Sequence, residues 1–355
     1  MADSPAKSVI VVGGGIVGLA IASAAQARGH RVTLIARDRP EDTASGVAAG
    51  MIAPALEAMN DFDPRLGFLR LTAAQAAWFD LLDLWPEPAQ RLLAAARARS
   101  ETFYCAEPLA APEGLERLRL TGAMTGWLAQ DDVSAAGFDP ESWRVVRVTG
   151  DWLIEAATLL AALRLGLAVP VVTGEAVDVA TRRVELATGE YFEADDVIIA
   201  AGYAGAALAE HVPSLARLVP IKGHLLDIDG IERYGVTRSP NGYYAGYGGY
   251  GKFGASMQEG RSDLAVEADI VTDLEARARA LRIDAHAGIP RVGIRAASPD
   301  GWPMIGRDRA SGVWVATAMR RNGYVFAPLA ARMMLAFLDG ETPSEAALYD
   351  PDRFS

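Results

Sequence analysis

Three glycines near the start of the chain have the spacing of a phosphate-binding turn. The stretch GGGIVG places Gly13, Gly15 and Gly18 in the pattern G-x-G-x-x-G, with Ile16 and Val17 inside it. Glycines at these positions let the backbone turn tightly and approach a pyrophosphate, whose charge lies at the N-terminus of the following helix. The chemistry that this spacing indicates is the binding of a dinucleotide cofactor.

The elements around this turn support the same interpretation. Residues 8 to 12 (SVIVV) are a short β-branched run without alternation, which is typical of a buried parallel strand. We expect a helix from Ile16 to Arg28, ending at Gly29, and a second strand over residues 31 to 35. The motif therefore lies in a strand–helix–strand unit.

The end of the second strand raises the question of which cofactor binds. An acidic residue is common there because it holds a ribose hydroxyl, whereas this chain has Ala36 and Arg37, with Asp38 one position later. An Arg at this point usually indicates a 2′-phosphate and therefore NADP. The glycine motif alone does not separate NAD(P) from FAD.

Helices and strands alternate along the rest of the chain, which indicates a mixed α/β architecture. We predict helices over residues 65–99, 152–165, 270–283 and 323–338. We predict strands over residues 116–121, 143–148, 170–173, 176–179, 182–186, 291–297 and 313–318, and antiparallel strands within 217–258. The stretch ADDVIIAAG, residues 194 to 202, repeats the buried strand followed by glycine, so one domain is predicted to be left and re-entered.

Composition argues against several classes of function. A net charge of −11 disfavours binding to nucleic acid or to an anionic membrane. The four histidines (His30, His211, His224 and His286) share no metal-ligand spacing, so no metal site is predicted. Cys105 is the only cysteine, which suits a reducing cytoplasm, and we see neither a signal peptide nor a membrane-spanning run. The sequence predicts a cytoplasmic enzyme.

Several stretches resemble the FAD-dependent D-amino-acid oxidase and glycine oxidase family. LIARDRPEDTAS and GVAAGMIAP, within residues 34 to 54, are similar to segments of D-amino-acid oxidases, and the second also resembles AAGMLAP of glycine oxidases. VPIKGHLL, residues 219 to 226, resembles the segment leading into the substrate sheet. GIRAASPDGWPMIGR and RRNGYVFAP, within residues 293 to 328, are similar to glycine and sarcosine-type oxidases. The chain departs from the family at Tyr203, where Trp is frequent, and lacks the GHGGYG of eukaryotic D-amino-acid oxidases.

The resemblance implies a fold. Its class would be α/β with an α+β substrate domain: a Rossmann-type FAD-binding domain plus an antiparallel-sheet substrate domain, in the glutathione-reductase-like fold of this family. The FAD-binding domain would be discontinuous, with residues 1–60, 150–220 and 290–355. The substrate-binding domain would take residues 61–149 and 221–289.

The resemblance also implies FAD, bound non-covalently because Cys105 lies far outside these motifs. Arg37 and Asp38 would lie beside the adenosine, as an FAD variant of the ribose site and not as a sign of NADP. The residues expected at FAD are Gly13, Gly15, Ile16, Val17, Gly18, Ala36, Arg37, Asp38, Ala44, Ser45, Ala48, Ala49, Gly50, Met51, Val177, Ala201, Gly202, Arg295, Arg321, Asn322, Gly323 and Tyr324.

Five residues would serve catalysis in such an enzyme. Arg295 would grip the substrate carboxylate bidentately, and Arg321 matches the family's second active-site arginine. Either Tyr243 or Tyr244 would support the carboxylate; only one should reach the pocket because neighbours on a strand face opposite ways. Met257 matches a residue near the substrate in glycine oxidases.

The implied activity is oxidative deamination of glycine, sarcosine or a small D-amino acid. Hydride would pass to flavin N5, the imine would hydrolyse to a 2-oxo acid and ammonia, and O2 would become H2O2. The expected partners are a small amino acid and O2, with no nucleic acid and no membrane; a homo-oligomer is left open. Two alternatives stay open: a D-amino-acid dehydrogenase that uses a quinone or other carrier, and a non-catalytic flavin-binding protein. Arg320, outside the family pattern, is either solvated or recognises an acidic side chain.

Overall fold

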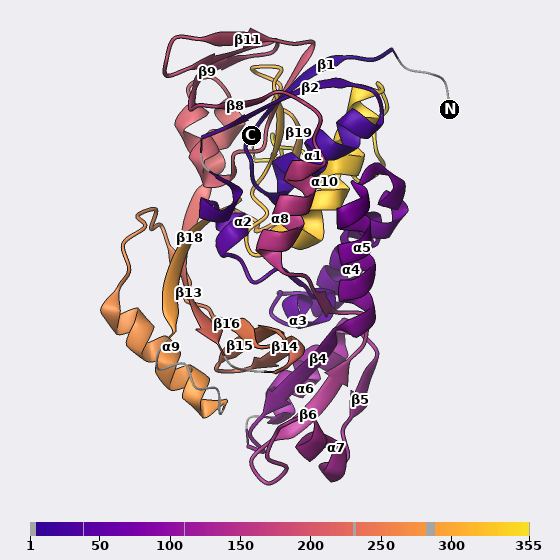
Figure 1. Cartoon of the computed structure of the whole chain (residues 1–355), viewed down its shortest axis with the longest axis vertical. Helices are drawn as coiled ribbons and strands as arrows, with labels where there is room; N and C mark the ends of the chain where they lie inside the picture. The colour runs from indigo at the N-terminus through magenta and orange to yellow at the C-terminus, as the bar shows by residue number, and fades with distance from the viewer. Residues whose placement is uncertain (1–4, 38, 110, 230–231, 282–287, 355) are drawn as a thin grey trace.

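The computed structural model describes residues 5–37, 39–109, 111–229, 232–281 and 288–354. Figure 1 shows β1, β2 and β8 with helices α1, α8 and α10 in the upper part of the molecule, near both chain ends. The lower part holds a large sheet with α6, α7 and α9. Among the described residues, no helix combines the length and the apolar character that crossing a bilayer requires.

A six-stranded sheet forms the upper part, in the order β19-β20-β12-β1-β2-β8. Neighbouring strands are parallel, except that β19 and β20 are antiparallel. The strands are β1 (Ser8–Val12), β2 (Arg31–Ala36), β8 (Val171–Thr173), β12 (Asp196–Ile199), β19 (Met304–Arg307) and β20 (Trp314–Thr317). Residues 9 to 12 of β1 are buried, which explains its uninterrupted apolar run.

Two helices close one face of this sheet. Helix α1 (Ile16–Ala27) packs against α10 (Gly323–Leu338), and both share an apolar core with β1. The chain leaves α1 through Gly29, whose φ of +85° favours glycine. The helices predicted from Ile16 and over residues 323–338 are thus confirmed, the second with the predicted bounds.

Two other predicted helices are shorter than expected. The helix predicted over residues 65–99 is interrupted: α4 (Pro64–Asp80) and α5 (Glu87–Arg99) flank the 3₁₀ turn η2 (Leu82–Leu84). Pro86 has no amide hydrogen and therefore starts a new helix instead of continuing the first. The helix predicted over 152–165 begins later, as α8 (Ala156–Leu165), because residues 152 and 153 form a strand.

A nine-stranded mixed sheet forms the lower part, in the order β17-β13-β16-β15-β14-β4-β6-β5, with β18 also paired to β13. Its strands are β4 (Glu101–Ala106), β5 (Thr125–Trp127), β6 (Arg144–Val148), β13 (Val219–Asp229), β14 (Tyr234–Ser239), β15 (Gly242–Tyr247), β16 (Tyr250–Gly254), β17 (Gln258–Glu259) and β18 (Ile289–Ala297). The helices beside it are α6 (Ala111–Thr121), α7 (Gln130–Ala135) and α9 (Ala268–Ala280). The predicted strand over residues 116–121 is wrong because that segment belongs to α6, whose Leu118 and Thr121 share its buried face.

Smaller elements complete the fold. A three-stranded sheet contains β9 (Ala176–Ala180), β10 (Arg183–Leu186) and β11 (Tyr191–Glu193), and β3 (Met51–Ile52) pairs with β7 (Trp152–Leu153). The remaining helical segments are η1 (Pro40–Asp42), α2 (Ala44–Val47), α3 (Pro54–Ala58), η3 (Gly202–Leu208), η4 (Pro213–Arg217) and α11 (Ala346–Tyr349).

Two packing contacts cross the boundaries of the proposed division into two domains. Strand β18 pairs with β13 over residues 289–297, in the lower sheet, although the boundary was placed at residue 290. Helices α4 and α5 share the core of α1 and α10, although residues 61–149 were assigned to the substrate domain. The boundaries stay a proposal.

Candidate active site

A cavity of about 820 Å³ lies where the six-stranded sheet meets the lower sheet. On one side it is lined at the carboxyl ends of β1, β2 and β12, the edge at which open α/β sheets bind ligands. On the other side it is lined by segments of β13, β15 and β18 and by the loop after β16. The cavity therefore joins a nucleotide-type edge to an antiparallel sheet.

The glycine turn forms a cradle at the first edge. Gly13 has φ +125°, and a Cβ there would stand 2.3 Å from the carbonyl oxygen of Ala200 on the neighbouring strand. A Cβ at Gly15 would stand 3.0 Å from Ser45 Oγ, and the Ile16 N–H donates to the same oxygen. Since the neighbouring backbone excludes a side chain at Gly13 and the start of α1 lines the cavity, the turn suits a pyrophosphate.

Most of the residues expected at FAD line the cavity. They are Gly13, Gly15, Ile16, Val17, Arg37, Ala44, Ser45, Ala48, Ala49, Gly50, Met51, Ala201, Gly202, Arg295, Arg321, Gly323 and Tyr324. Asp38 lies outside the residues that the structure describes.

Four expected residues do not line it. Gly18 serves packing instead, because a Cβ there would stand 1.9 Å from the Gly13 oxygen. Ala36 is paired with Thr173 in the sheet, and Val177 is exposed while its neighbour Ala176 lines the cavity. Asn322 is the N-cap of α10 and does not belong to the lining, although its buried Oδ1 has no partner among the described residues.

An acidic residue of another element lies beside Arg37. Glu175, in the turn between β8 and β9, lines the cavity, and its Oε1 lies 3.3 Å from Arg37 Nη1. Nothing in the sequence near Arg37 indicated this neighbour, since the pairing of β2 with β8 brings it there.

The end of the cavity beside the lower sheet contains Arg295, Tyr243 and Met257. Arg295 lies on β18, and its Nη1 is 3.4 Å from the Ser256 carbonyl oxygen; among the described residues it makes no ion pair. Burial lowers the pKa of its guanidinium, whereas Tyr243 and Glu57 raise it. Space for the guanidinium exists because residue 223 is glycine: a Cβ there would stand 2.1 Å from Nη1.

The two tyrosines lie on opposite faces of β15. Tyr243 lines the cavity, whereas Tyr244 is fully buried in a separate apolar core with Phe103 and Cys105. The placement of Tyr244 at the substrate is therefore not supported, for the physical reason that successive strand residues alternate. Cys105 likewise does not line the cavity.

Glu57 is a buried carboxylate on α3 at the cavity wall that was not predicted from the sequence. It pairs with Arg321 and, at 3.2 Å, with Arg238; Arg321 also lies 3.3 Å from Asp61. Burial raises the pKa of the Glu57 carboxyl, but Arg321 and Arg238 outweigh burial, so the net shift is downward. Burial raises the pKa of Asp61 despite Arg321. Glu57 is thus an anion shared by two cations.

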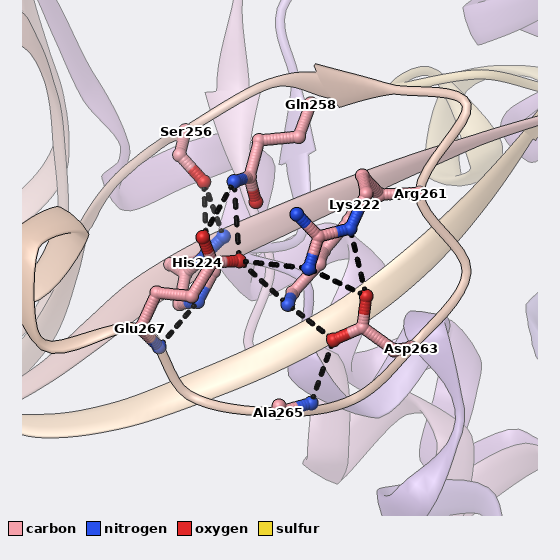
Figure 2. A network of polar contacts seen from close by, with 8 residues as sticks. All are labelled: Lys222, His224, Ser256, Gln258, Arg261, Asp263, Ala265 and Glu267. Carbon is pink, nitrogen blue, oxygen red and sulfur yellow. Dashed lines mark hydrogen bonds and ion pairs between the residues drawn. The ribbon is translucent and has the colours of Figure 1, made fainter.

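A loop over residues 255–267 carries Met257, Ser262 and Leu264 to the cavity lining. Backbone hydrogen bonds tie residues 256–260 of the loop to β13, and side chains hold the rest. Figure 2 shows Lys222, from β13, facing Asp263 and Glu267 of the loop. The fully buried Lys222 Nζ donates to Asp263 at 2.6 Å and to Glu267 at 2.7 Å.

Neighbouring groups complete this loop network. Gln258 and Arg261 also donate to Glu267, and the N–H of Glu267 donates to Nε2 of His224. Burial lowers the pKa of His224, and Lys222 lowers it further, so His224 accepts this bond as a neutral ring. The network fixes the position of the loop at the cavity.

Replacing Lys222 with Met should loosen this loop. The change leaves Asp263 and Glu267 without their common cation, at a cost of about 2 kcal/mol because both carboxylates are partly exposed. We expect faster tryptic cleavage after Arg261 and a higher KM. Lys7→Met, at a half-exposed lysine paired with Asp196, is the control. Equal cleavage rates in the two variants would show that Lys222 does not hold the loop.

Comparison with known proteins identifies the family. Residues 8–337 match the family model described as FAD dependent oxidoreductase, DAO. This chain belongs to that family. Its cofactor is FAD, so the inference of NADP from Arg37 alone is wrong, and the predicted family and fold class are confirmed.

The individual family members that the chain matches have low sequence identity to it. The chain is 27% identical to the tRNA 5-methylaminomethyl-2-thiouridine biosynthesis bifunctional protein MnmC of Caulobacter vibrioides, over 95% of this chain and 55% of that protein. The chain thus spans about half the length of the first curated relatives it matches. It is 26% identical to the glycine oxidase of Pseudomonas aeruginosa, over 95% of this chain and 96% of that protein.

Solved structures share the fold. Glycine oxidase from Geobacillus kaustophilus superposes with a TM-score of 0.79 at 23% identity, covering 98% of each chain. Iminodiacetate oxidase from Chelativorans sp. BNC1 gives 0.76 at 20% identity, covering 97% of this chain and 98% of that one.

Proposed function

We propose that this FAD-dependent oxidoreductase oxidises the amine of a small amino acid, such as glycine, sarcosine or a D-amino acid, with O2 as acceptor. The observation that carries the proposal is Arg295. Its guanidinium lies in the cavity beside Tyr243, and no carboxylate of the described chain pairs with it. A cation left without a counter-ion in such a place is a site for a substrate carboxylate.

The residues of the chain would position the substrate for this reaction. Arg295 binds the carboxylate through two N–H groups, and the Tyr243 hydroxyl donates a further hydrogen bond. Met257 and Leu264 line this end of the cavity and remain exposed to solvent. FAD, when bound, supplies the redox chemistry by accepting a hydride from the substrate Cα. The imine product then hydrolyses in water to a 2-oxo acid and ammonia.

The N-terminus of α10 would act on the cofactor. Gly323 and Tyr324 line the cavity at the start of this helix, and Asn322 provides no side-chain cap. The positive end of the helix dipole, with Arg321 beside it, would stabilise negative charge that develops on the ring system.

A peroxide-coupled screen over glycine, sarcosine, D-proline, D-alanine and D-aspartate tests the proposal. We expect at least one of these amines to reduce the bound flavin in the absence of O2 and to yield H2O2 in its presence. Reduction with a dye acceptor but not with O2 would instead indicate a dehydrogenase. If no amine reduces the flavin, the substrate class is wrong and a non-catalytic role is favoured.

We also propose a cytoplasmic location. With Cys105 as the single cysteine the chain can form no internal disulfide, which suits a reducing compartment. The net charge of −11 gives no support to a nucleic-acid substrate.

Tyr243→Phe should raise KM about tenfold while changing kcat less, because the substrate carboxylate loses one hydrogen bond to a neutral donor. Burial raises the pKa of Tyr243 to about 12, although Arg295 lowers it, so the phenol keeps its proton below that pH. The ratio of KM between variant and wild type should therefore stay constant from about pH 7 to about pH 10.

Tyr244→Phe is the matched control. The Tyr244 hydroxyl is buried without a hydrogen-bond partner among the described residues, so its removal should change neither KM nor stability appreciably. Similar KM values for the two variants would contradict the assignment of Tyr243 to the substrate.

A further inference from the structure

The substrate end of the cavity contains more cations than the proposed reaction uses. Arg321 and Arg238 share the carboxylate of Glu57, and Arg321 also reaches Asp61. These four groups carry two positive and two negative charges and compensate one another. The four groups therefore leave no strong excess of positive charge to attract a ligand.

Two other guanidinium groups of the lining have no such compensation. Arg295 contacts only a neutral carbonyl oxygen, and Arg320 makes no side-chain hydrogen bond or ion pair with any residue that the structure describes. The proposed function assigns one substrate carboxylate to Arg295. Arg320 then remains a half-buried cation without a counter-ion.

The electrostatic surroundings of Arg320 agree with this contact pattern. Burial lowers the pKa of its guanidinium and Arg321 lowers it further, whereas Asp61 and Glu259 raise it from a distance. None of these acids lies within 4.0 Å of it, the limit for an ion pair. A bound anion would favour the charged guanidinium and so offset the lowering of its pKa by burial and by Arg321.

The backbone brings Arg320 close to the carboxylate anchor at some cost. Its φ is +51°, in the left-handed region that a non-glycine residue adopts at a cost of about 1 kcal/mol. The N–H of Arg320 donates to the carbonyl oxygen of Ala296 at 2.7 Å, next in sequence to Arg295. The bend between β20 and α10 therefore places Arg320 beside β18 and on the cavity wall.

We propose that Arg320 forms a second anion subsite beside Arg295, so that the preferred substrate is an amine carrying two carboxylates. Iminodiacetate, D-aspartate and D-glutamate belong to this class. The first carboxylate would bind Arg295 and the second Arg320, while the oxidised carbon stays between the cofactor and Tyr243. The inference rests on the proposed function for its substrate class, but the subsite itself can be measured without turnover.

Binding of non-oxidisable carboxylates to the holoenzyme tests the subsite. Acetate has one carboxylate, whereas malonate and succinate have two, and their binding can be followed by calorimetry and by the change in flavin absorption. We expect the better dicarboxylate to bind at least about tenfold more tightly than acetate, because it adds a charge-assisted contact. A wild-type enzyme without this preference would overturn the subsite.

Arg320→Asn is the informative variant because Asn tolerates the left-handed backbone, which keeps the bend foldable. We expect it to abolish the dicarboxylate preference and leave acetate binding unchanged; Arg320→Lys should retain part of the preference. Arg279→Gln, at an exposed arginine of α9, is the control and should retain all of it. If Arg320→Asn weakens acetate and dicarboxylates equally, Arg320 is not a separate subsite.

Oxidation assays separate failure of the subsite from failure of the proposed function. The subsite predicts that Arg320→Asn lowers kcat/KM for D-aspartate relative to D-alanine by the same factor as the binding preference. Amines that are oxidised without any effect of Arg320 would overturn the subsite alone. An Arg320-dependent preference for dicarboxylates, with no amine reducing the flavin, would keep the subsite and overturn the proposed function.

Discussion

Replacing Arg295 with Gln is expected to lower kcat/KM for amino-acid oxidation by about 10²- to 10³-fold. The guanidinium is the proposed contact for the first substrate carboxylate, and Gln offers a neutral amide in place of the charged, planar fork. The loss should appear in KM and also in kcat, since a loosely held substrate no longer presents its Cα–H to the cofactor. Steady-state kinetics and acetate binding to the holoenzyme measure the two effects separately.

Three further variants test the proposed role of Arg295. Arg295→Lys keeps the charge but not the planar fork, so it should restore only part of the affinity. Gly223→Ala should act in the same direction, because the added Cβ would stand 2.1 Å from Arg295 Nη1 and displace the guanidinium. Arg279→Gln should be inert. A KM within twofold of wild type for Arg295→Gln would mean that the carboxylate binds elsewhere, or that the protein is not an amino-acid oxidase.

The cofactor half of the fold was predictable because its signals are local. Residues 8 to 12 and the glycines after them specify a buried strand, a turn and a helix within a short stretch, and the structure contains all three. The helix over residues 323–338 follows from a mostly apolar run, interrupted by Arg332, between Gly323 and Asp339. Each of these elements depends on neighbours in sequence.

The lower sheet and the polar part of the site were harder to predict from the sequence, since they depend on contacts between distant segments. Strand β4 pairs in parallel with β14, more than a hundred positions later, and no periodicity of either strand reveals that partner. Glu57 faces Arg238 and Arg321 only because α3 is placed against the site by Asp151, whose carboxylate accepts from the N–H groups of Ala55 and Leu56. In the sequence it is one glutamate in an alanine-rich stretch.

Arg37, in the cofactor half, also has a neighbour from a distant segment that the sequence does not reveal. A rule that reads one position after β2 predicts NADP. The structure instead places Glu175 beside that arginine, from a turn that the rule does not include. Residue type at a single position was therefore a poorer guide to the cofactor than the several resembling stretches along the chain.

Glu57→Gln is expected to have two opposite effects, a loss of stability and a gain in anion affinity. The carboxylate is buried between Arg321 and Arg238, so its removal leaves Arg321 with Asp61 alone and Arg238 without a carboxylate. Breaking such a buried arrangement costs about 3 kcal/mol of unfolding free energy. The same change adds one positive charge to the cavity, and acetate should bind severalfold more tightly.

The pH dependence of the stability loss in Glu57→Gln shows whether the loss comes from the charge of the side chain or from its packing. In the folded protein the pKa of Glu57 lies below its usual 4.5, so its stabilising contribution is complete above that pH and disappears as the pH falls through the folded value. Thermal midpoints of wild type and Glu57→Gln should therefore differ most near neutrality and converge in acid. Glu341→Gln, at an exposed glutamate, controls for loss of charge alone. A midpoint difference that persists unchanged into acid would assign the loss to packing of the side chain, because the amide keeps its shape at every pH while only the carboxylate changes charge.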